Sequence, residues 1–427
     1  MTNLTNKQTT NTKLSFLNNI ASWYMVKRYH QVELFMKYPH EVQQEWFLKL
    51  IESGRETEFG KKNGFEKIKN AEQFRREIPL QSYESLNPYI QRLRHGEQFL
   101  LWPTDVKWFA KSAGTTNDKS KFIPVTDESL KGCHYKGGKD MITFYCNNYP
   151  DHQLFTGKNL ALGGSHSTDN FENYETYAGD VSAIIIRNLP LIADYFRSPS
   201  VEIALISEWE EKLEKLSHST INENVVSLAG VPSWMLVLMK KILEVSGKKN
   251  ISQVWPNLEV YFHGGVSYSP YRKQVNDIIG KEIRLLELYN ASEGFFGIQD
   301  QRDSEDLLLM LDYGIYYEFL PEEEWNNPGG KTILLEEVQL KKNYALIITT
   351  NGGLWRYNIG DTIEFTSLLP YRFRISGRTK HFLNAFGEEV MIANAEKALE
   401  IACEKTGAKI NEYTVAPIFM KIGRAHV

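Results

Sequence analysis

A polar stretch between residues 111 and 124 has the composition of a phosphate-binding loop. Seven of its fourteen residues carry a hydroxyl or an amine: Lys111, Ser112, Thr115, Thr116, Lys119, Ser120 and Lys121. A short predicted strand, Val106–Ala110, precedes it. Hydroxyls, backbone N–H groups and lysine ammoniums can surround a polyphosphate, although a solvated surface loop has the same composition. It is not a P-loop, because the Gly-Lys-Ser/Thr ending is absent.

Two glycines follow the next informative strand, which we predict at Leu258–Phe262. The stretch reads His263-Gly264-Gly265-Val266-Ser267. Without side chains, Gly264 and Gly265 would let a flat ring lie against the backbone. A tight turn explains the same pair equally well.

The segment Tyr289–Gly294 follows a predicted strand at Glu282–Leu288. The Glu293 carboxylate beside the Ser292 hydroxyl suits a Mg²⁺ ion that bridges phosphate oxygens, because Mg²⁺ takes only one or two protein carboxylates. A strand-exit turn with a solvated glutamate is the alternative. Aromatic rings that could pack on a base or an acyl group lie in the same stretch: Tyr289, Phe295 and Phe296.

Two later turns carry single charged residues suited to a nucleotide. Asp361, on the turn that ends Trp355–Asp361, could accept hydrogen bonds from two ribose hydroxyls. Arg378 could fork onto phosphate or ribose oxygens. An ordinary hairpin turn and a domain linker are the respective alternatives.

The amino-acid composition excludes several classes of protein. The 427 residues are 42% hydrophobic and 24% charged, as in a soluble globular protein with more than one subdomain. A net charge of −4 gives no electrostatic reason to expect nucleic acid or an anionic membrane as partner. The three cysteines show no Cys-x-x-Cys spacing, and the sequence has neither a signal-peptide core nor a long apolar run. We therefore expect a cytoplasmic protein.

The surrounding elements predict an α/β fold. Strands alternate with helices from about residue 106 to 300, which indicates a mainly parallel sheet with helices on both faces. From 307 to 365, closely spaced strands indicate a smaller antiparallel sheet or barrel, with one strand at Thr332–Leu335. Other predicted elements are helices at Leu14–Tyr38, Pro39–Ser53, Asn70–Arg94 (broken at Pro79 and Pro88) and Ile392–Lys405, and a strand at Glu412–Ala416.

In order and separation, these motifs resemble the Gretchen Hagen family of auxin-responsive acyl acid amido synthetases, in particular its bacterial members. That family belongs to the adenylate-forming superfamily, and the resemblance covers residues 15 to 420. It implies an N-terminal adenylation domain at 1–379, with α/β subdomains at about 1–305 and a small β subdomain at about 306–376. Residues 380–427 would begin a small α+β C-terminal lid.

The resemblance also implies roles for single residues. Those matched to nucleotide-binding positions are Ser112, Thr115, Thr116 and Lys121 for phosphate, Gly264, Gly265 and Tyr289 for adenine, Ser292 and Glu293 for phosphate and Mg²⁺, Asp361 for ribose, and Arg378. Lys121 and Glu293 would be catalytic, with Glu293 the metal ligand and Lys380 the hinge of the lid. Three positions depart from the family pattern: Ala113, Asp118 and Asn358. Arg356 is a candidate replacement for the arginine missing at Asn358.

The implied reaction uses ATP and Mg²⁺. A carboxylic acid becomes an acyl-adenylate, and an amine, which the resemblance implies is that of an amino acid, takes the acyl group. Acyl-CoA ligation and a nucleotide-binding homologue without turnover are the alternatives. The sequence names neither acid nor amine; candidate acyl-pocket segments are Val181–Arg197, Val231–Met239 and the phenylalanines at 295 and 296.

Family members continue further into the lid, so we expect the chain to be truncated at its C-terminus. The last six residues, Ile422–Val427, can be encoded by a common sequencing-library adapter. We expect the natural sequence to stop matching this chain near Met420 or Lys421.

Overall fold

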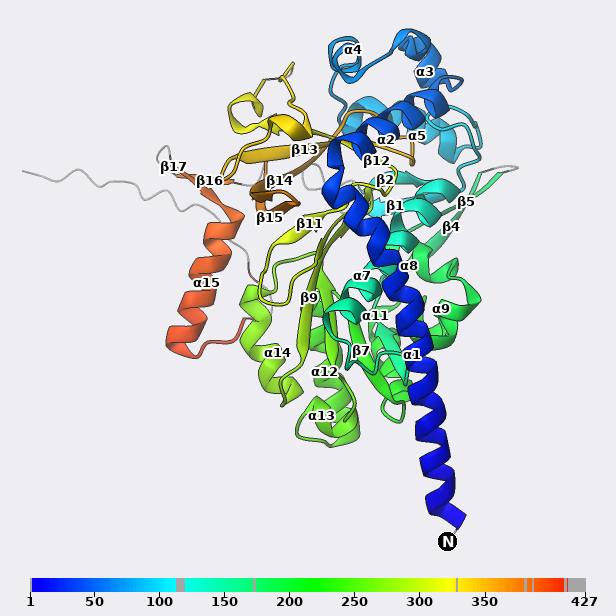
Figure 1. The fold of residues 1–427 in the computed structure, drawn as a ribbon, viewed down its shortest axis with the longest axis vertical. Coiled ribbons are helices and arrows are strands. Elements are labelled where there is room, and N and C mark those ends of the chain that lie inside the picture. Colours follow the sequence, from blue (N-terminus) through cyan, green and yellow to red (C-terminus); the bar gives the residue numbers. More distant parts are fainter. Residues whose placement is uncertain are drawn as a thin grey trace, which may run out of the picture.

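A computed structural model describes residues 2–112, 120–171, 174–327, 329–379, 382–385, 388–410 and 413. Its helices surround one long sheet (Figure 1). The helices are α1 (Thr2–Lys37), α2 (Pro39–Gly54), α3 (Glu58–Lys62), α4 (Ala71–Glu77), α5 (Tyr83–Arg94), α6 (Asp127–Ser129), α7 (Tyr135–Asn148), α8 (Val181–Arg187), α9 (Leu191–Phe196), α10 (Val201–Ala204), α11 (Trp209–Thr220), α12 (Pro232–Ser246), α13 (Ile251–Val254), α14 (Arg272–Ile279) and α15 (Ile392–Thr406). None of the described helices is both long and apolar enough to cross a bilayer.

The main sheet has eleven strands, and the pairing of neighbouring strands changes from parallel to antiparallel partway across it. Its order is β12-β13-β14-β15-β11-β10-β9-β8-β7-β3-β6. These strands are β3 (Lys158–Ala161), β6 (Arg197–Ser198), β7 (Val225–Gly230), β8 (Val260–Gly264), β9 (Arg284–Ala291), β10 (Gly294–Gln299), β11 (Leu307–Leu309), β12 (Ile315–Pro321), β13 (Asn343–Thr350), β14 (Tyr357–Leu368) and β15 (Tyr371–Arg378). Neighbours from β6 to β9 pair in parallel, and those from β9 to β12 pair antiparallel.

The predicted α/β fold is confirmed, with one difference in how its parts join. The antiparallel strands do not close into a separate sheet, because β11 pairs with β10 on one side and β15 on the other. The carboxyl ends of β8 and β9 are therefore held close to the β14–β15 hairpin. Because the sheet is continuous, the polar residues after β9 lie close to Asp361 and Arg378, although they are far apart in the sequence.

A second sheet has the order β2-β1-β5-β4, and a third consists of β16 (Phe382–Ala385) and β17 (Glu388–Met391). The second sheet contains β1 (Trp108–Ser112), β2 (Lys121–Val125), β4 (His166–Phe171) and β5 (Tyr174–Gly179). The described ends of the predicted phosphate loop belong to a pair of strands, β1 and β2, which pair antiparallel up to Ser112 and Lys121. Residues 113–119, between these strands, lie outside the described part of the chain.

Helix ends follow local rules, and two sequence expectations were wrong. Helix α12 begins at Pro232 and ends before Gly247, whose φ of 66° suits a residue without a side chain. The helix was expected to break at Pro88, but Pro88 lies inside α5, which continues to Arg94. The expected strand at Thr332–Leu335 amounts to one isolated pairing of Ile333 with Phe319. The expected strand at Glu412–Ala416 falls outside the described residues, apart from Tyr413.

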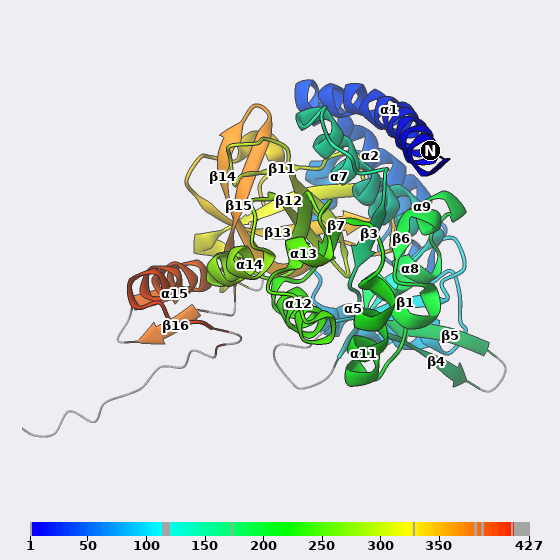
Figure 2. The same cartoon turned by 90° about the horizontal axis from the view of Figure 1, so that it is seen from below.

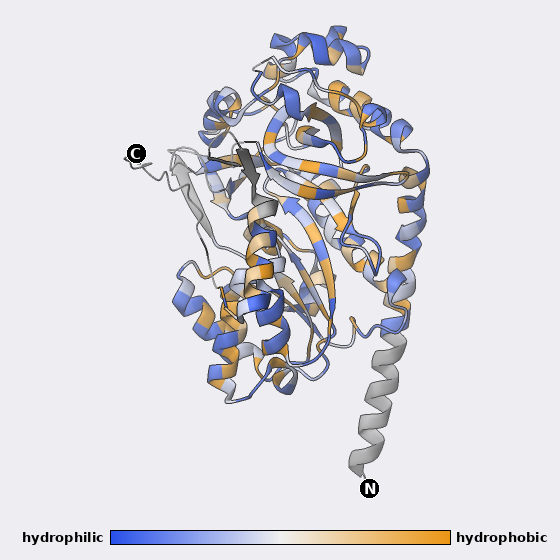
Figure 3. Ribbon diagram, turned by 90° about the vertical axis from the view of Figure 1, so that its left-hand side faces the viewer, coloured by the Kyte–Doolittle hydropathy of each residue, from blue (hydrophilic) through white to orange (hydrophobic). Residues whose placement is uncertain are grey.

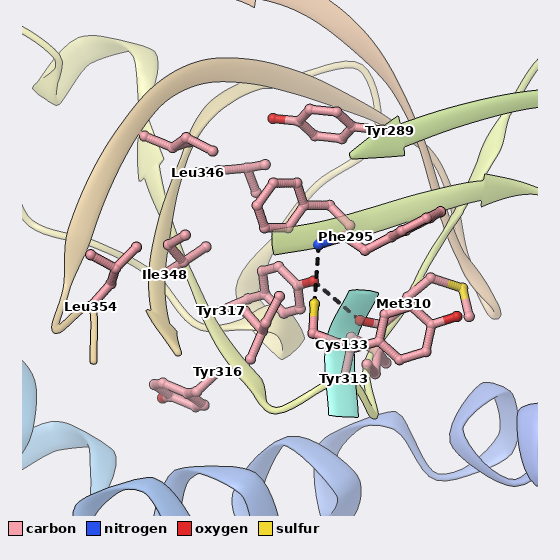
Figure 4. Packing of buried hydrophobic residues seen from close by; sticks show 14 of the residues in the cluster. Cys133, Tyr289, Phe295, Met310, Tyr313, Tyr316, Tyr317, Leu346, Ile348 and Leu354 are labelled. Carbon is pink, nitrogen blue, oxygen red and sulfur yellow. Dashed lines mark hydrogen bonds between the residues drawn. The ribbon is translucent and has the colours of Figure 1, made fainter. Parts of the chain in front are cut away.

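Buried apolar side chains form two main cores, one on the parallel half with α12 and α14, and one that joins α2, α7 and the antiparallel strands. Seen from below, α12, α13 and α14 cover one side of the sheet (Figure 2). Hydrophobic and hydrophilic residues are mixed along the helices (Figure 3), whereas β10, β12 and β13 are buried along nearly their whole length. The second core contains the ring cluster of Figure 4, including Phe295, Tyr313 and Tyr317.

Candidate active site

A cleft of about 560 Å³ opens where β8 and β9 end, between the β1–β2 hairpin and the β14–β15 hairpin. It brings together eight of the predicted site residues: Ser112, Lys121, Gly265, Tyr289, Ser292, Glu293, Asp361 and Arg378. They come from four separate stretches of the chain. A larger cavity of about 1280 Å³, between α2 and β1, contains none of them.

The remaining predicted residues have different outcomes. Gly264 does not line the cleft; a Cβ there would come within 2.3 Å of the Leu288 carbonyl oxygen, so close strand packing requires this glycine. Gly265 does line it, with a φ of 83° that favours glycine. Thr115, Thr116 and Lys380 lie outside the described residues.

Three side chains join β9, β14 and β15 at one wall of the cleft. The Tyr289 hydroxyl donates a 2.6 Å hydrogen bond to Asp361 Oδ2. Arg378 Nε lies 2.7 Å from Asp361 Oδ1, and the two residues are direct cross-strand partners. Burial, followed by the nearby Asp361 charge, raises the pKa of Tyr289, so the phenol remains a donor. The Asp361 carboxylate is therefore held in one orientation at the cleft wall, by Tyr289 at one oxygen and by Arg378 at the other.

Glu293 occupies the turn between β9 and β10. Burial and the charge of Asp361 raise its pKa to about 7, against the opposing effects of Lys121 and Arg378. Among the described residues, no group of three or more metal-ligating side chains exists. One carboxylate with phosphate oxygens and water fits Mg²⁺, which rarely has an all-protein cage. A divalent cation would also favour the ionised form of Glu293.

The stem of the β1–β2 hairpin forms the opposite wall. Ser112 and Lys121 are cross-strand partners at its last described pair, and both line the cleft. The Lys121 ammonium lies 5.7 Å from the centre of the Tyr83 ring, on α5. A cation therefore faces the cleft opposite Glu293 and Asp361.

The structure corrects the suggestion that Arg356 replaces the arginine missing at Asn358. Arg356 is buried, pairs with Glu318 at 2.9 Å, and does not line the cleft. Asn358 instead accepts a 2.9 Å hydrogen bond from the Gly360 N–H, within β14. The expected turn at Asp361 was wrong, because this residue lies in β14, next to an irregularity in its pairing with β13.

The acyl-pocket candidates that the structure describes do not line the cleft. Phe295 and Phe296 are buried, and the Phe295 N–H donates to Cys133 Sγ at 3.2 Å (Figure 4). None of the described candidate residues on α8, α9 or α12 lines the cleft.

Sequence reasoning missed an acidic end of the cleft. Glu287, on β9, has its pKa raised to about 7 by burial and by the charges of Glu305 and Glu396. Glu396 belongs to α15, and Arg374 of β15 lines the same end. A charged residue among the leucines of β9 was the available signal for Glu287. No local pattern could have placed α15 here.

With this geometry established, comparison with known proteins identifies the class. The solved structure of GH3.15 acyl acid amido synthetase superposes with a TM-score of 0.74 at 16% identity, over 88% of this chain and 76% of that one. A 2-hydroxyisobutyryl-CoA ligase in complex with an acyl-AMP superposes with a TM-score of 0.52 at 11% identity, over 88% and 72%. The fold is that of adenylate-forming ligases.

Sequence comparison then gives the family. The GH3 family N-terminal domain matches residues 28–283, and the GH3 family central domain matches residues 308–378. The chain therefore belongs to the GH3 family, which confirms the resemblance drawn from the motifs. It is 23% identical to indole-3-acetic acid-amido synthetase GH3.2 of Arabidopsis thaliana, over 91% of this chain and 83% of that protein. It is 22% identical to jasmonoyl–L-amino acid synthetase JAR4 of Nicotiana attenuata, over 78% and 68%.

Proposed function

We propose that this protein is an ATP-dependent acyl acid amido synthetase, an acid–amino acid ligase that works through an acyl-adenylate. The observation that carries the proposal is the convergence of Lys121, Tyr289, Glu293 and Asp361 in one cleft. Family membership and the names of its relatives support the same reaction class.

In this proposal ATP lies along the cleft. The adenine packs between Tyr289 and the bare backbone at Gly265, and Asp361, held by Arg378, accepts from the ribose hydroxyls. Lys121 and Ser112 contact the phosphates from the hairpin. Glu293 would hold Mg²⁺, which supplies charge neutralisation on the phosphates when bound.

Adenylation then follows from charge and position. A carboxylate oxygen of the acid attacks the α-phosphorus, the bond to the bridging oxygen breaks, and pyrophosphate leaves. Lys121 stabilises the negative charge that develops on the phosphate oxygens. Because the cleft fixes both reactants, much of the barrier is lowered by orientation.

Amide formation completes the reaction. A deprotonated amine attacks the acyl carbon, and AMP leaves with the bonding electrons of the acyl–oxygen bond. We infer that residues 380–427 begin a lid that turns about Lys380 between the two steps. A cytoplasmic setting is part of the proposal, supported by the three free cysteines.

The test is carboxylate-dependent exchange of labelled pyrophosphate into ATP, screened over aryl, indolyl and fatty acids. We expect exchange with at least one acid, and its loss in Lys121→Met and Asp361→Asn. Lys131→Met is the matched control, because Lys131 is exposed and paired only with Asp127 in the described structure. ATP binding without exchange for any acid would favour the nucleotide-binding homologue.

The acceptor is tested separately. Product formation with an amino-acid panel, compared with coenzyme A, distinguishes the amido synthetase from an acyl-CoA ligase. Thioester formation with no amide would contradict the proposed acceptor while leaving adenylation intact.

A further inference from the structure

The segment Gln81–Tyr83, at the start of α5, touches both walls of the nucleotide cleft. On the ribose side it is joined by backbone hydrogen bonds to the strand that carries Asp361. The Gln81 N–H donates to the Arg356 carbonyl oxygen at 2.9 Å, and the Asn358 N–H donates to the Gln81 carbonyl oxygen at 2.9 Å. This makes residue 81 an extra, parallel partner of β14 at Tyr357.

On the phosphate side the contact is made by a side chain. The Tyr83 hydroxyl accepts a 3.0 Å hydrogen bond from the Phe122 N–H, one residue from Lys121. Strand β2 is the edge of its sheet, so an N–H that points away from β1 has no strand partner. The Arg94 guanidinium, at the far end of α5, lies 3.7 Å from the Phe122 ring centre. Helix α5 therefore holds β2 from its open side.

The segment that precedes α5 is itself anchored by a buried charge. The Arg356 guanidinium donates to the Arg75 carbonyl oxygen at 2.8 Å and to the Ile78 carbonyl oxygen. It also pairs with the buried Glu318. These contacts tie the segment that precedes α5 to the start of β14, independently of the β1–β2 hairpin.

We propose that Tyr83 is a positioning residue that sets the separation between the phosphate-binding hairpin and the ribose-binding strand. Through Phe122 it holds Lys121 at a fixed distance from Asp361, so that one ATP spans both. This inference rests on the proposed function, since it assumes that Lys121 contacts phosphate. It assigns a role to a residue that does not itself line the cleft.

The test compares ATP with adenosine, because adenosine uses the ribose and adenine side alone. In Tyr83→Phe, which keeps the ring and removes the hydroxyl, we expect the Kd for ATP to rise about fivefold, as for one lost hydrogen bond. The Kd for adenosine should stay unchanged. Tyr89→Phe is the matched control on the same helix: the Tyr89 hydroxyl accepts from Lys62 at 3.3 Å, away from the cleft, and both affinities should remain those of the wild type.

Three results would overturn the inference, and they are distinguishable. An unchanged Kd for ATP in Tyr83→Phe would show that the hydroxyl positions nothing. Equal weakening of ATP and adenosine with a lower Tm would show a merely structural role. If the wild-type protein bound adenosine but gained nothing from the phosphates of ATP, the proposed phosphate role of Lys121 would fail first.

Discussion

The Tyr289 hydroxyl donates a hydrogen bond to Asp361 at 2.6 Å, although 72 positions separate the two residues in the sequence. Tyr289 lies on β9, the last strand of the parallel half of the sheet, and Asp361 lies on β14, in the antiparallel half. One bond thus couples the residue proposed to face adenine to the residue proposed to bind ribose. The proposed nucleotide site therefore spans the place where the strand pairing changes from parallel to antiparallel.

Removal of that hydroxyl should weaken ATP binding more than it weakens the fold. For Tyr289→Phe we expect KM for ATP in the exchange assay to rise roughly tenfold, because hydrogen bonds to charged groups contribute about 1.5–3 kcal/mol. Tyr317→Phe is the control: its buried hydroxyl donates to the Met310 carbonyl oxygen at 3.1 Å, outside the cleft. An equal rise in KM for both variants would contradict the assigned role of Tyr289.

Glu293 should give the exchange reaction a pH dependence. Its pKa of about 7 without bound metal means that exchange measured at limiting Mg²⁺ should rise between about pH 6 and about pH 8, as the carboxyl group loses its proton. Glu293→Gln should abolish exchange at both pH values. Wild-type exchange that stays flat across this range would refute the role given to this carboxylate.

The same residue should destabilise the fold at high pH. The folded-state pKa of about 7 is above the ordinary 4.5, so the favourable contribution is present at low pH and is lost as the pH rises through about 7. Glu293→Gln should therefore raise the free energy of unfolding at about pH 8, by on the order of 1–3 kcal/mol, and leave it unchanged near pH 4. Urea unfolding at the two pH values measures the difference; equal effects at both would contradict the sign.

Arg356 should matter for stability and not for nucleotide contact. Arg356→Met leaves the buried Glu318 carboxylate without its partner, which costs about 3–5 kcal/mol. Arg76→Met, at an exposed pair with Glu77, should cost under about 1 kcal/mol. Denaturant titration compares them. A stable Arg356→Met protein with greatly weakened ATP binding would restore the phosphate role that the structure argues against.

Gly264, the last residue of β8, should differ from a glycine in open space. Gly264→Ala would place a Cβ 2.3 Å from the Leu288 carbonyl oxygen and should cost about 1–3 kcal/mol. Gly138→Ala, in α7, meets nothing within 4 Å and should stabilise by about 0.5–1 kcal/mol. Thermal unfolding checks both. No loss of stability in Gly264→Ala would mean that β8 and β9 can separate there.

The residue types and their order in the sequence predicted that the 111–124 stretch, the Tyr289–Glu293 turn and Asp361 belong to one nucleotide site, and the structure places described residues of all three in one cleft. Strand and helix patterns also identified the α/β fold, since local hydrophobic periodicity and glycine and proline positions dictate these elements. Arg356 and the phenylalanines after Glu293 were misplaced for one reason: burial depends on distant chain segments. Glu318 and Cys133, which hold them, are not visible in the local pattern.

The sequence by itself therefore determined the family and the reaction class, and it predicted eight residues that the structure places in one cleft, because a nucleotide requires particular side chains at particular loops. Only the tertiary structure showed that the two sheet halves are continuous, that Tyr289 holds Asp361, and that α5 joins β2 to β14. These relationships are hydrogen bonds between residues tens to hundreds of positions apart. Their geometry is fixed by packing of the whole chain and leaves no signature in neighbouring residues.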